Sequence, residues 1–445
     1  MKNSKTLKSK RTTTKGSKAL KSKGSTKRKG STKRKRSTKG KRSTMEFCPR
    51  IANELMLKEI QKTSCKNVVA SPLSINAILN MLVAGSTGDT LERMLGFLGS
   101  KNVDEINAES RKIMEVAKCG GGGGAGAGAA WYIDRYGEGP VLTMVNGAWV
   151  DQRFPLVPEY KEEVLKGIFK SEGNNVDFRT KANEVVDQIN SWADTASRGL
   201  IKNVLQHGSI KKDTVVILAN GLYFKGNWDN DYIFDQLSTE SRKFYLLNGD
   251  NVSVPFMTSW RKYYYGSFDG FKVLKIPYQS SKPNHISMYF FLPDEQDGLQ
   301  NLLGILNSDS ESLNEYFELK EEKLDEFWIP KFKFAFDFDV SKVMDDMGES
   351  LSIIKNPRDL SKMVQNSENV PFFILNMFQK AYIEIDEKGT KAAAITNMPV
   401  RGGGGPPPPG INSFVADHPF VFMIREEQSG LVFFSGAVVN PIQEN

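Results

Sequence analysis

Hydrophobic positions recur with two different periods along this 445-residue chain, and each period predicts a type of element. Ile75, Ile78, Leu79 and Leu82 fall on one face of a helix, so we expect a buried helix there. Residues 214–224 are nearly all apolar, which predicts a central strand covered on both faces. The chain therefore contains both helices and strands with substantial buried surface.

Period-two alternation predicts further strands in the C-terminal third. Phenylalanine occupies every second position of residues 332–338, which indicates a strand with one buried face. Residues 378–385 alternate in the same way, and after a loose segment we expect residues 414–424 to form a second strand. Helices and strands mix without the regular order of βαβ units, a mixture that suits an α+β fold.

The segment between those last two strands has an unusual composition. Residues 386–394 read Asp-Glu-Lys-Gly-Thr-Lys-Ala-Ala-Ala, although alanine-rich segments ordinarily favour helix. Small side chains lower the cost of entering a close-packed sheet. The composition suits a segment that is exposed in one state and slides between packed strands in another.

Charge divides the chain into two parts. Residues 1–44 contain 14 Lys and 5 Arg with no acidic residue, so subtracting their +19 from the overall +8 leaves −11 on residues 45–445. With almost no apolar residues, the first part cannot bury a core and is expected to be a disordered basic tail. No linker interrupts residues 45–445, so we expect one domain there.

The basic tail contains a six-residue Ser-Thr-Lys repeat over residues 25–42. One interpretation is a solvated tail that only aids solubility. The other is that the Lys/Arg clusters at 27–29 and 33–36 bind an import receptor, or bind nucleic acid non-specifically through phosphates. The Ser-Thr pairs are also candidate phosphorylation sites that would weaken such binding.

Targeting and cysteine content favour a reducing compartment. We find no signal peptide and no stretch long enough for a transmembrane helix, so we expect no membrane partner. Cys48, Cys65 and Cys119 are too few and too scattered for a disulfide framework or a metal site. The nucleus, the cytoplasm or both are the expected locations.

Many motifs of this chain, and the order in which they occur, resemble those of the serpin family. Their sequences are most similar to its plant Z-type branch. The matching segments, in the family's order, are residues 67–75, 146–151, 189–192, 199–203, 218–228, 254–258, 288–293, 329–332 and 414–419. The resemblance extends over residues 50–441 and implies three sheets surrounded by about nine helices, with an exposed reactive-centre loop at about 387–413. It also implies a monomer.

The resemblance implies mechanical inhibition of a serine or papain-like cysteine protease. In serpins the protease attacks the loop and forms an acyl-enzyme, and the cleaved loop then inserts into the main sheet and distorts the protease. An enzymatic function is not expected. Only His207, His285 and His418 are present, and we expect His418 to pack and hydrogen-bond rather than act as a base.

Cofactors and metals are not expected either. The glycine-rich run at 120–130 matches a dinucleotide fingerprint only because any glycine run does so. A flexible loop before a strand that begins at Val141 is the better interpretation.

Residue by residue, the resemblance assigns a proximal hinge to the reactive loop. The hinge residues are Glu387, Lys388, Gly389, Thr390, Lys391, Ala392, Ala393 and Ala394. Alternation places Thr390, Ala392, Ala394 and Thr396 on one face of an inserted strand, and these are the side chains that the family usually buries. All four are small.

The distal half of the loop departs from the family pattern. The family's loop length places the scissile bond at Gly403–Gly404, with Arg401–Gly402 as second choice for a trypsin-like protease. Pro399 would lie inside the inserted strand, where proline is disfavoured, and residues 406–409 form a stiff tetraproline segment. Two hypotheses follow: an inhibitor with an unusual loop, or a non-inhibitory scaffold that recruits a partner through its tail or loop.

The resemblance also assigns residues to the region where the main sheet opens. These are Ser71, Ser74, Asn220, Gln379 and Trp228. The family often has histidine at the position of Gln379, and an amide can likewise donate and accept hydrogen bonds. Trp228 would lie under the point of loop insertion, or would simply be a core aromatic residue.

Overall fold

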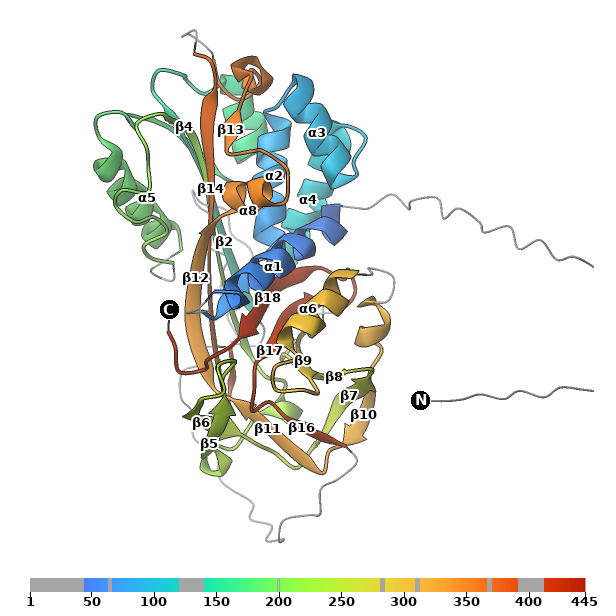
Figure 1. Cartoon of the computed structure of the whole chain (residues 1–445). Helices are drawn as coiled ribbons and strands as arrows, with labels where there is room; N and C mark the ends of the chain where they lie inside the picture. The colour runs from blue at the N-terminus through green and yellow to red at the C-terminus, as the bar shows by residue number, and fades with distance from the viewer. Residues whose placement is uncertain are drawn as a thin grey trace, which may run out of the picture. The chain divides into compact units, whose positions relative to one another are not determined.

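Three β-sheets and the helices around them make up the part of the chain that the structure describes (Figure 1). The computed structural model describes residues 44–62, 66–119, 140–197, 199, 201–280, 285–308, 313–365, 370–390 and 412–444. All of them belong to one unit, Arg42–Asn445. The predicted α+β class with three sheets is confirmed.

The main sheet has the strand order β12-β14-β15-β4-β2-β3. Its strands are β2 (Val141–Asp151), β3 (Glu172–Val176), β4 (Thr214–Asn227), β12 (Phe332–Asp339), β14 (Phe373–Asp386) and β15 (Gly389–Thr390), with β13 (Ile353–Ile354) paired to β14 beside this path. Every residue of β4 is buried as far as Phe224, as its apolar sequence predicts. β14 alternates strictly between buried and half-buried positions, so it presents one face to the core.

The other two sheets lie against the lower half of the main sheet in Figure 1. The inner sheet consists, in spatial order, of β1 (Val68–Ala70), β18 (Val432–Val438), β17 (Phe420–Glu426), β9 (Ile286–Pro293), β8 (Phe271–Pro277), β7 (Lys262–Phe268) and β10 (Lys320–Lys323). The small sheet consists of β16 (Ser413–Val415), β11 (Glu326–Pro330), β6 (Asn251–Met257) and β5 (Glu240–Tyr245).

Helices cover both faces of the main sheet (Figure 1). The α-helices are α1 (Thr44–Ile60), α2 (Pro72–Ala84), α3 (Gly88–Leu98), α4 (Val103–Cys119), α5 (Ala182–Ala196), α6 (Leu299–Ser308) and α8 (Val340–Asp346). Shorter helical turns are the π-helix η1 (Tyr160–Lys166) and the 3₁₀-helices η2 (Asn230–Tyr232), η3 (Gln236–Ser238), η4 (Glu315–Phe317) and η5 (Pro357–Leu360). Within the described residues, no helix is both long and apolar enough to cross a membrane.

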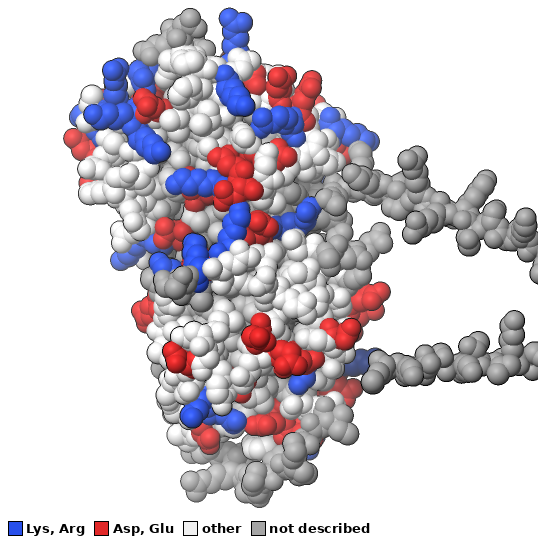
Figure 2. All heavy atoms as spheres, in the orientation of Figure 1, with Lys and Arg blue, Asp and Glu red and all other residues white. Residues whose placement is uncertain are grey.

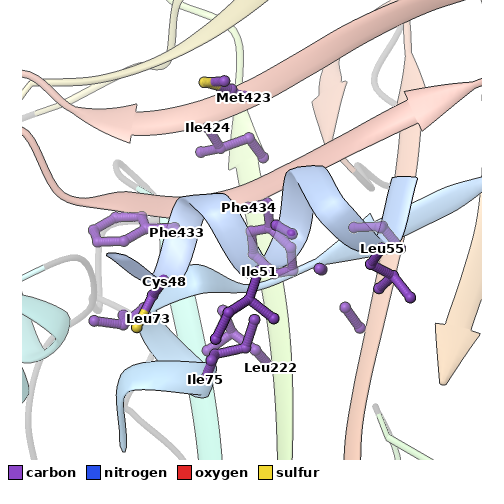
Figure 3. Packing of buried hydrophobic residues seen from close by; sticks show 14 of the residues in the cluster. Cys48, Ile51, Leu55, Leu73, Ile75, Leu222, Met423, Ile424, Phe433 and Phe434 are labelled. Atoms are coloured by element: carbon purple, nitrogen blue, oxygen red, sulfur yellow. The ribbon is translucent and has the colours of Figure 1, made fainter. Parts of the chain in front are cut away.

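Alternation along β4 explains how one strand serves two cores. Ile217 and Ala219 pack with α5 on one face, whereas Leu218 and Leu222 face the larger core on the other side. That larger core is shown in Figure 3, where Cys48 and Ile51 of α1 and Leu73 of α2 pack near Phe434 of β18. Burial raises the pKa of the Cys48 thiol, which therefore stays protonated.

One predicted element is wrong. Residues 414–424 were expected to form a single strand, but the structure divides them between β16 in the small sheet and β17 in the inner sheet. Pro419 has no N–H for a sheet ladder, and the Asp417 carbonyl accepts a hydrogen bond from Tyr245 outside any strand pairing. His418 is 6 % exposed and bridges Asp417 and the Pro293 carbonyl, which is a packing role.

Candidate functional site

The predicted hinge begins as a tight hairpin at the end of β14. Ile385 pairs with Thr390 and Asp386 with Gly389, so Glu387 and Lys388 form a two-residue loop. On its other side β15 pairs with β4, with Gly389 opposite Asn227 and Thr390 opposite Gly226. Two residues of the hinge are thus already a strand between β14 and β4.

Gly389 makes this hairpin sterically feasible. Its φ of +141° lies in a region that side chains rarely adopt, and a Cβ there would lie 2.1 Å from the carbonyl oxygen of Gly226. The main chain of β15 therefore approaches β4 more closely than any other residue would allow.

Thr390 enters the core rather than the solvent. Its side chain is 1 % exposed, and its hydroxyl oxygen lies 2.6 Å from that of Tyr278, directly after β8. Burial raises the pKa of Tyr278, so its phenol remains neutral and able to donate a hydrogen bond. The Tyr278 ring stacks on Trp228 with centroids 4.7 Å apart.

Trp228 contacts the hairpin through two hydrogen bonds. Its indole Nε1–H donates to the Asp386 carbonyl at 3.0 Å, and its backbone N–H donates to the Lys388 carbonyl at 2.8 Å. The indole is fully buried. Trp228 is thus a core aromatic residue that also contacts the hairpin.

Glu387 is buried although it occupies the loop of a hairpin. Its carboxylate accepts hydrogen bonds from Lys331 at 2.9 Å and from Thr239 at 2.8 Å, and its carbonyl accepts one from the backbone N–H of Phe234. Burial opposes ionisation, but the hydrogen bonds from Lys331, its own backbone N–H and Thr239 outweigh it, so the pKa of Glu387 is lowered. The pKa of neighbouring Asp386 is raised, chiefly by burial.

A cluster of polar side chains lies further along the same two strands, where β4 and β14 pair directly and in parallel. Gln379 lies opposite Asn220 there. The Gln379 amide donates to the Ser71 carbonyl at 2.8 Å and accepts from the Ser71 N–H at 3.1 Å, while the Ser71 hydroxyl caps α2 through the N–H of Ser74. Asn220 donates to Asn146 of β2. We call Ser71, Ser74, Asn220 and Gln379 the seam cluster; all four are buried.

The predicted sheet-opening residues therefore form two groups, because Trp228 belongs to the hinge and not to the seam cluster. Four other hinge residues, Lys391, Ala392, Ala393 and Ala394, lie outside the described residues, as do both candidate scissile bonds, Gly403–Gly404 and Arg401–Gly402. The chain is described again from Asn412, where β16 runs parallel to β11.

Sequence reasoning missed three partners of the hinge, Tyr278, Lys331 and Thr239. Lys331 gave a weak signal, since it is a lone charge between the apolar ends of β11 and β12. Tyr278 and Thr239 gave none, because they reach the hinge only through the tertiary fold. Among the described residues, no group of His, Cys, Asp and Glu could hold a metal ion.

Three sheets, a hairpin whose second strand lies between β14 and β4 at one end of the main sheet, and a buried polar seam make up this architecture. A family model described as Serpin (serine protease inhibitor) matches residues 43–441, and the chain belongs to the serpin family. This is a family of protease inhibitors and not of enzymes, as predicted.

Plant Z-type serpins are among the relatives. A Serpin-ZX of Arabidopsis thaliana is 39% identical over 378 residues, which cover 84% of this chain and 92% of the relative. A Serpin-ZX of Hordeum vulgare is 36% identical over 399 residues, which cover 89% of this chain and 96% of the relative. The predicted resemblance to this branch is confirmed.

Solved structures agree with the fold. Arabidopsis AtSerpin1 in its native stressed conformation is 35% identical, covers 90% of this chain and 98% of its own, and has a TM-score of 0.76. Uncleaved ovalbumin, at 23% identity and a TM-score of 0.71, supports the fold alone. The predicted serpin fold is confirmed.

Proposed function

We propose that this protein inhibits serine or papain-like cysteine proteases as a suicide substrate, by inserting its cleaved loop into the main sheet. The observation that carries the proposal is β15, a two-residue strand of the hinge that already lies between β14 and β4. A hinge that has entered the sheet in the uncleaved chain indicates the path that the rest of the loop would follow.

The pairing of β15 with β14 and β4 specifies which residues the next loop positions would face on insertion. Position 391 would face Glu384 and Lys225, and position 392 would face Ile383 and Phe224. The next position would meet Tyr382, which is paired directly with Tyr223. Beyond that point each inserted residue must separate β14 from β4, and gains strand pairing on both of its sides.

The small hinge side chains suit this path. Alternation sends positions 392 and 394 to the face on which Thr390 is buried, and both are alanine. The seam cluster lies ahead of them, because Gln379 and Asn220 face one another three residues beyond Tyr382 and Tyr223. Insertion must separate Gln379 on β14 from Asn220 on β4. During this separation the hydrogen bonds between Gln379 and Ser71 can keep β14 attached to the start of α2.

The test is incubation of the purified protein with trypsin, pancreatic elastase and papain, followed by denaturing gels and mass spectrometry of the loop fragments. We expect a covalent complex with at least one protease and a released peptide that identifies the cleaved bond. The inactive control is each protease with its nucleophile blocked beforehand. Cleavage of the loop by all three without any complex would contradict the proposal.

A second candidate function is favoured by the loop sequence itself. Pro399 would lie inside the inserted strand, and a Gly403–Gly404 bond offers a protease no side chain for its specificity pocket. A non-inhibitory scaffold would tolerate both. Thermal unfolding distinguishes the two functions, since loop cleavage raises the melting temperature sharply only if the loop inserts.

We also propose that residues 25–42 direct the protein to the nucleus through an import receptor. The face shown in Figure 2 carries Lys and Arg interspersed with Asp and Glu, so the case rests on the dense clusters at 27–29 and 33–36. A fluorescent fusion should lose nuclear enrichment when these clusters become alanine, but not when the serines and threonines between them do. Strongly salt-dependent binding to DNA would instead favour the nucleic-acid role.

A further inference from the structure

Asparagine is followed directly by glycine at three places in the chain, Asn146–Gly147, Asn220–Gly221 and Asn248–Gly249. In such a pair the glycine nitrogen can attack the side-chain carbonyl carbon of the asparagine, because glycine has no Cβ to obstruct the approach. The first two asparagines are buried in β2 and β4, whereas Asn248 is exposed in the turn between β5 and β6. We propose that Asn248 is a site of spontaneous deamidation in the folded protein, and that burial protects Asn146 and Asn220. The proposed modification does not depend on the proposed inhibition.

Hydrogen bonds within the turn of residues 246–250 bring the reacting atoms together. The Asn248 side-chain oxygen accepts a hydrogen bond from the Asp250 N–H at 3.0 Å, which closes a ring that contains both the Asn248 Cγ and the Gly249 nitrogen. As the nitrogen attacks, negative charge develops on that oxygen, and the Asp250 N–H is already placed to stabilise it. The Gly249 N–H itself donates to the Leu246 carbonyl at 3.0 Å, so this bond must open before the nitrogen reacts.

The exposed and buried sites differ in how much structure must open first. At Asn248 only the turn must open, and exposed turns lie at the low end of local opening free energies. Asn146 and Asn220 face each other across β2 and β4, where the Asn220 amide donates to Asn146 and β4 is also paired with β14. Such central strands open only with the whole domain, so deamidation there should be more than about a hundredfold slower than at Asn248.

The reaction needs only water as a co-reactant. The Gly249 nitrogen loses its proton and bonds to the Asn248 Cγ, while the bond from Cγ to Nδ2 breaks and ammonia leaves with that proton. The cyclic imide then takes up one water. Hydrolysis at Cγ gives aspartate, and hydrolysis at the main-chain carbonyl gives isoaspartate, in which the main chain continues through the former side chain.

Both products alter the contacts that close the turn. The Asn248 amide donates to the Asp250 carboxylate at 2.7 Å, so an aspartate would place two carboxylates in contact. Isoaspartate adds a methylene to the main chain inside the turn, which the Leu246 N–H closes by donating to the Asp250 carbonyl at 2.8 Å. We expect the turn to open while β5 and β6 stay paired, because Phe244 and Val254 anchor these strands in the core.

Peptide mapping of the full-length protein, aged in mildly alkaline buffer, tests the proposal beside a sample unfolded in guanidinium chloride. Mass spectrometry follows conversion of each asparagine amide to an acid, and a methyltransferase specific for isoaspartate detects that product. In the folded sample Asn248 should react and Asn146 and Asn220 should not; in the unfolded sample all three should react at similar rates. If Asn248 is as slow as the other two in the folded protein, or if all three react equally there, the proposal is overturned.

Gly249→Ala tests the attacking nitrogen. A methyl group beside that nitrogen should hinder its approach to the Asn248 Cγ and slow deamidation several-fold, and the fold has room for it because nothing lies within 4 Å of the new atom. Gly270→Ala is the matched control, since its φ of +82° is close to the +86° of Gly249 and its surroundings in the turn between β7 and β8 are equally open. This control should leave the Asn248 rate unchanged. Deamidation of Gly249→Ala at the wild-type rate, or equal slowing by both changes, would overturn attack by the Gly249 nitrogen.

Discussion

Two stretches of the same strand pair behave differently. Between Ile374 and Tyr382, β14 hydrogen-bonds directly to β4, and the seam cluster ties it to α2. Between Ile385 and Asp386 the two strands are held apart by β15, and the contacts there come from side chains of other segments. In the main sheet, β14 and β4 are therefore paired directly along most of their length and are already separated at one end. Loop insertion would extend an existing gap instead of creating one.

The largest expected effect comes from a charge placed in the open end. Thr390→Arg would bury a guanidinium group where the native side chain is 1 % exposed, at a cost of about 3 kcal/mol or more. The hinge should leave the sheet and be unable to return after cleavage. We expect covalent complex to fall more than a hundredfold while the loop is still cut, measured on denaturing gels. Thr390→Ser is the control, and normal inhibition by Thr390→Arg would refute insertion at this position.

Gly389→Ala should have the next largest effect, confined to the open end. The new methyl group would collide with the Gly226 carbonyl, and positive φ adds strain of about 1–3 kcal/mol. Peptides covering residues 386–390 should lose protection in hydrogen exchange, while the seam cluster keeps it. Gly208→Ala is the control, since its φ is +81° but nothing lies within 4 Å of the new atom. Equal effects of both changes would show that strain alone, and not the gap, is responsible.

The closed stretch is tested by Gln379→Leu. Loss of the amide leaves the buried N–H and carbonyl of Ser71 without their Gln379 partner, which should destabilise the native protein by about 2 kcal/mol. The urea midpoint of unfolding should fall, with hinge exchange almost unchanged. Gln152→Leu, at an exposed position, controls for the substitution itself. An unchanged midpoint would mean that the seam cluster contributes nothing to closure.

The smallest expected effect is that of pH on the ion pair between Glu387 and Lys331. Because the pKa of Glu387 is lowered in the held hinge, its ion pair with Lys331 stabilises that state above the usual carboxyl pKa, and this stabilisation is lost as the pH falls through the lowered pKa. Asp386 acts in the opposite sense, since its raised pKa makes protonation favour the held state first. Hinge exchange, corrected for its intrinsic pH dependence, should first slow and then accelerate on acidification, as Asp386 and then Glu387 take up a proton, and should be flat at higher pH up to about pH 8. Release in that range would identify another titrating group.

The fold could be predicted from the sequence, whereas the side chains that contact the hinge could not. Alternation in residues 378–385 and the apolar run at 214–224 depend on local pattern, and both strands form as expected. Gln379 and Ser71 could be paired only through the family resemblance. Tyr278, Lys331 and Thr239 lie 112, 56 and 148 residues from their hinge partners, and no local pattern links residues so far apart. The strand break at Pro419 was missed because apolar residues continue on both sides of it.

The change of sheet between β16 and β17 has a consequence for any molecule cut in its loop. The segment that follows the cut contributes β17 and β18, which lie between β1 and β9 inside the inner sheet, and its Ile424 and Phe434 are completely buried (Figure 3). A nicked molecule would thus remain a tight complex of two polypeptides that share one core, separable only by a denaturant. The same arrangement should allow a separately made C-terminal peptide to complete a truncated chain during refolding.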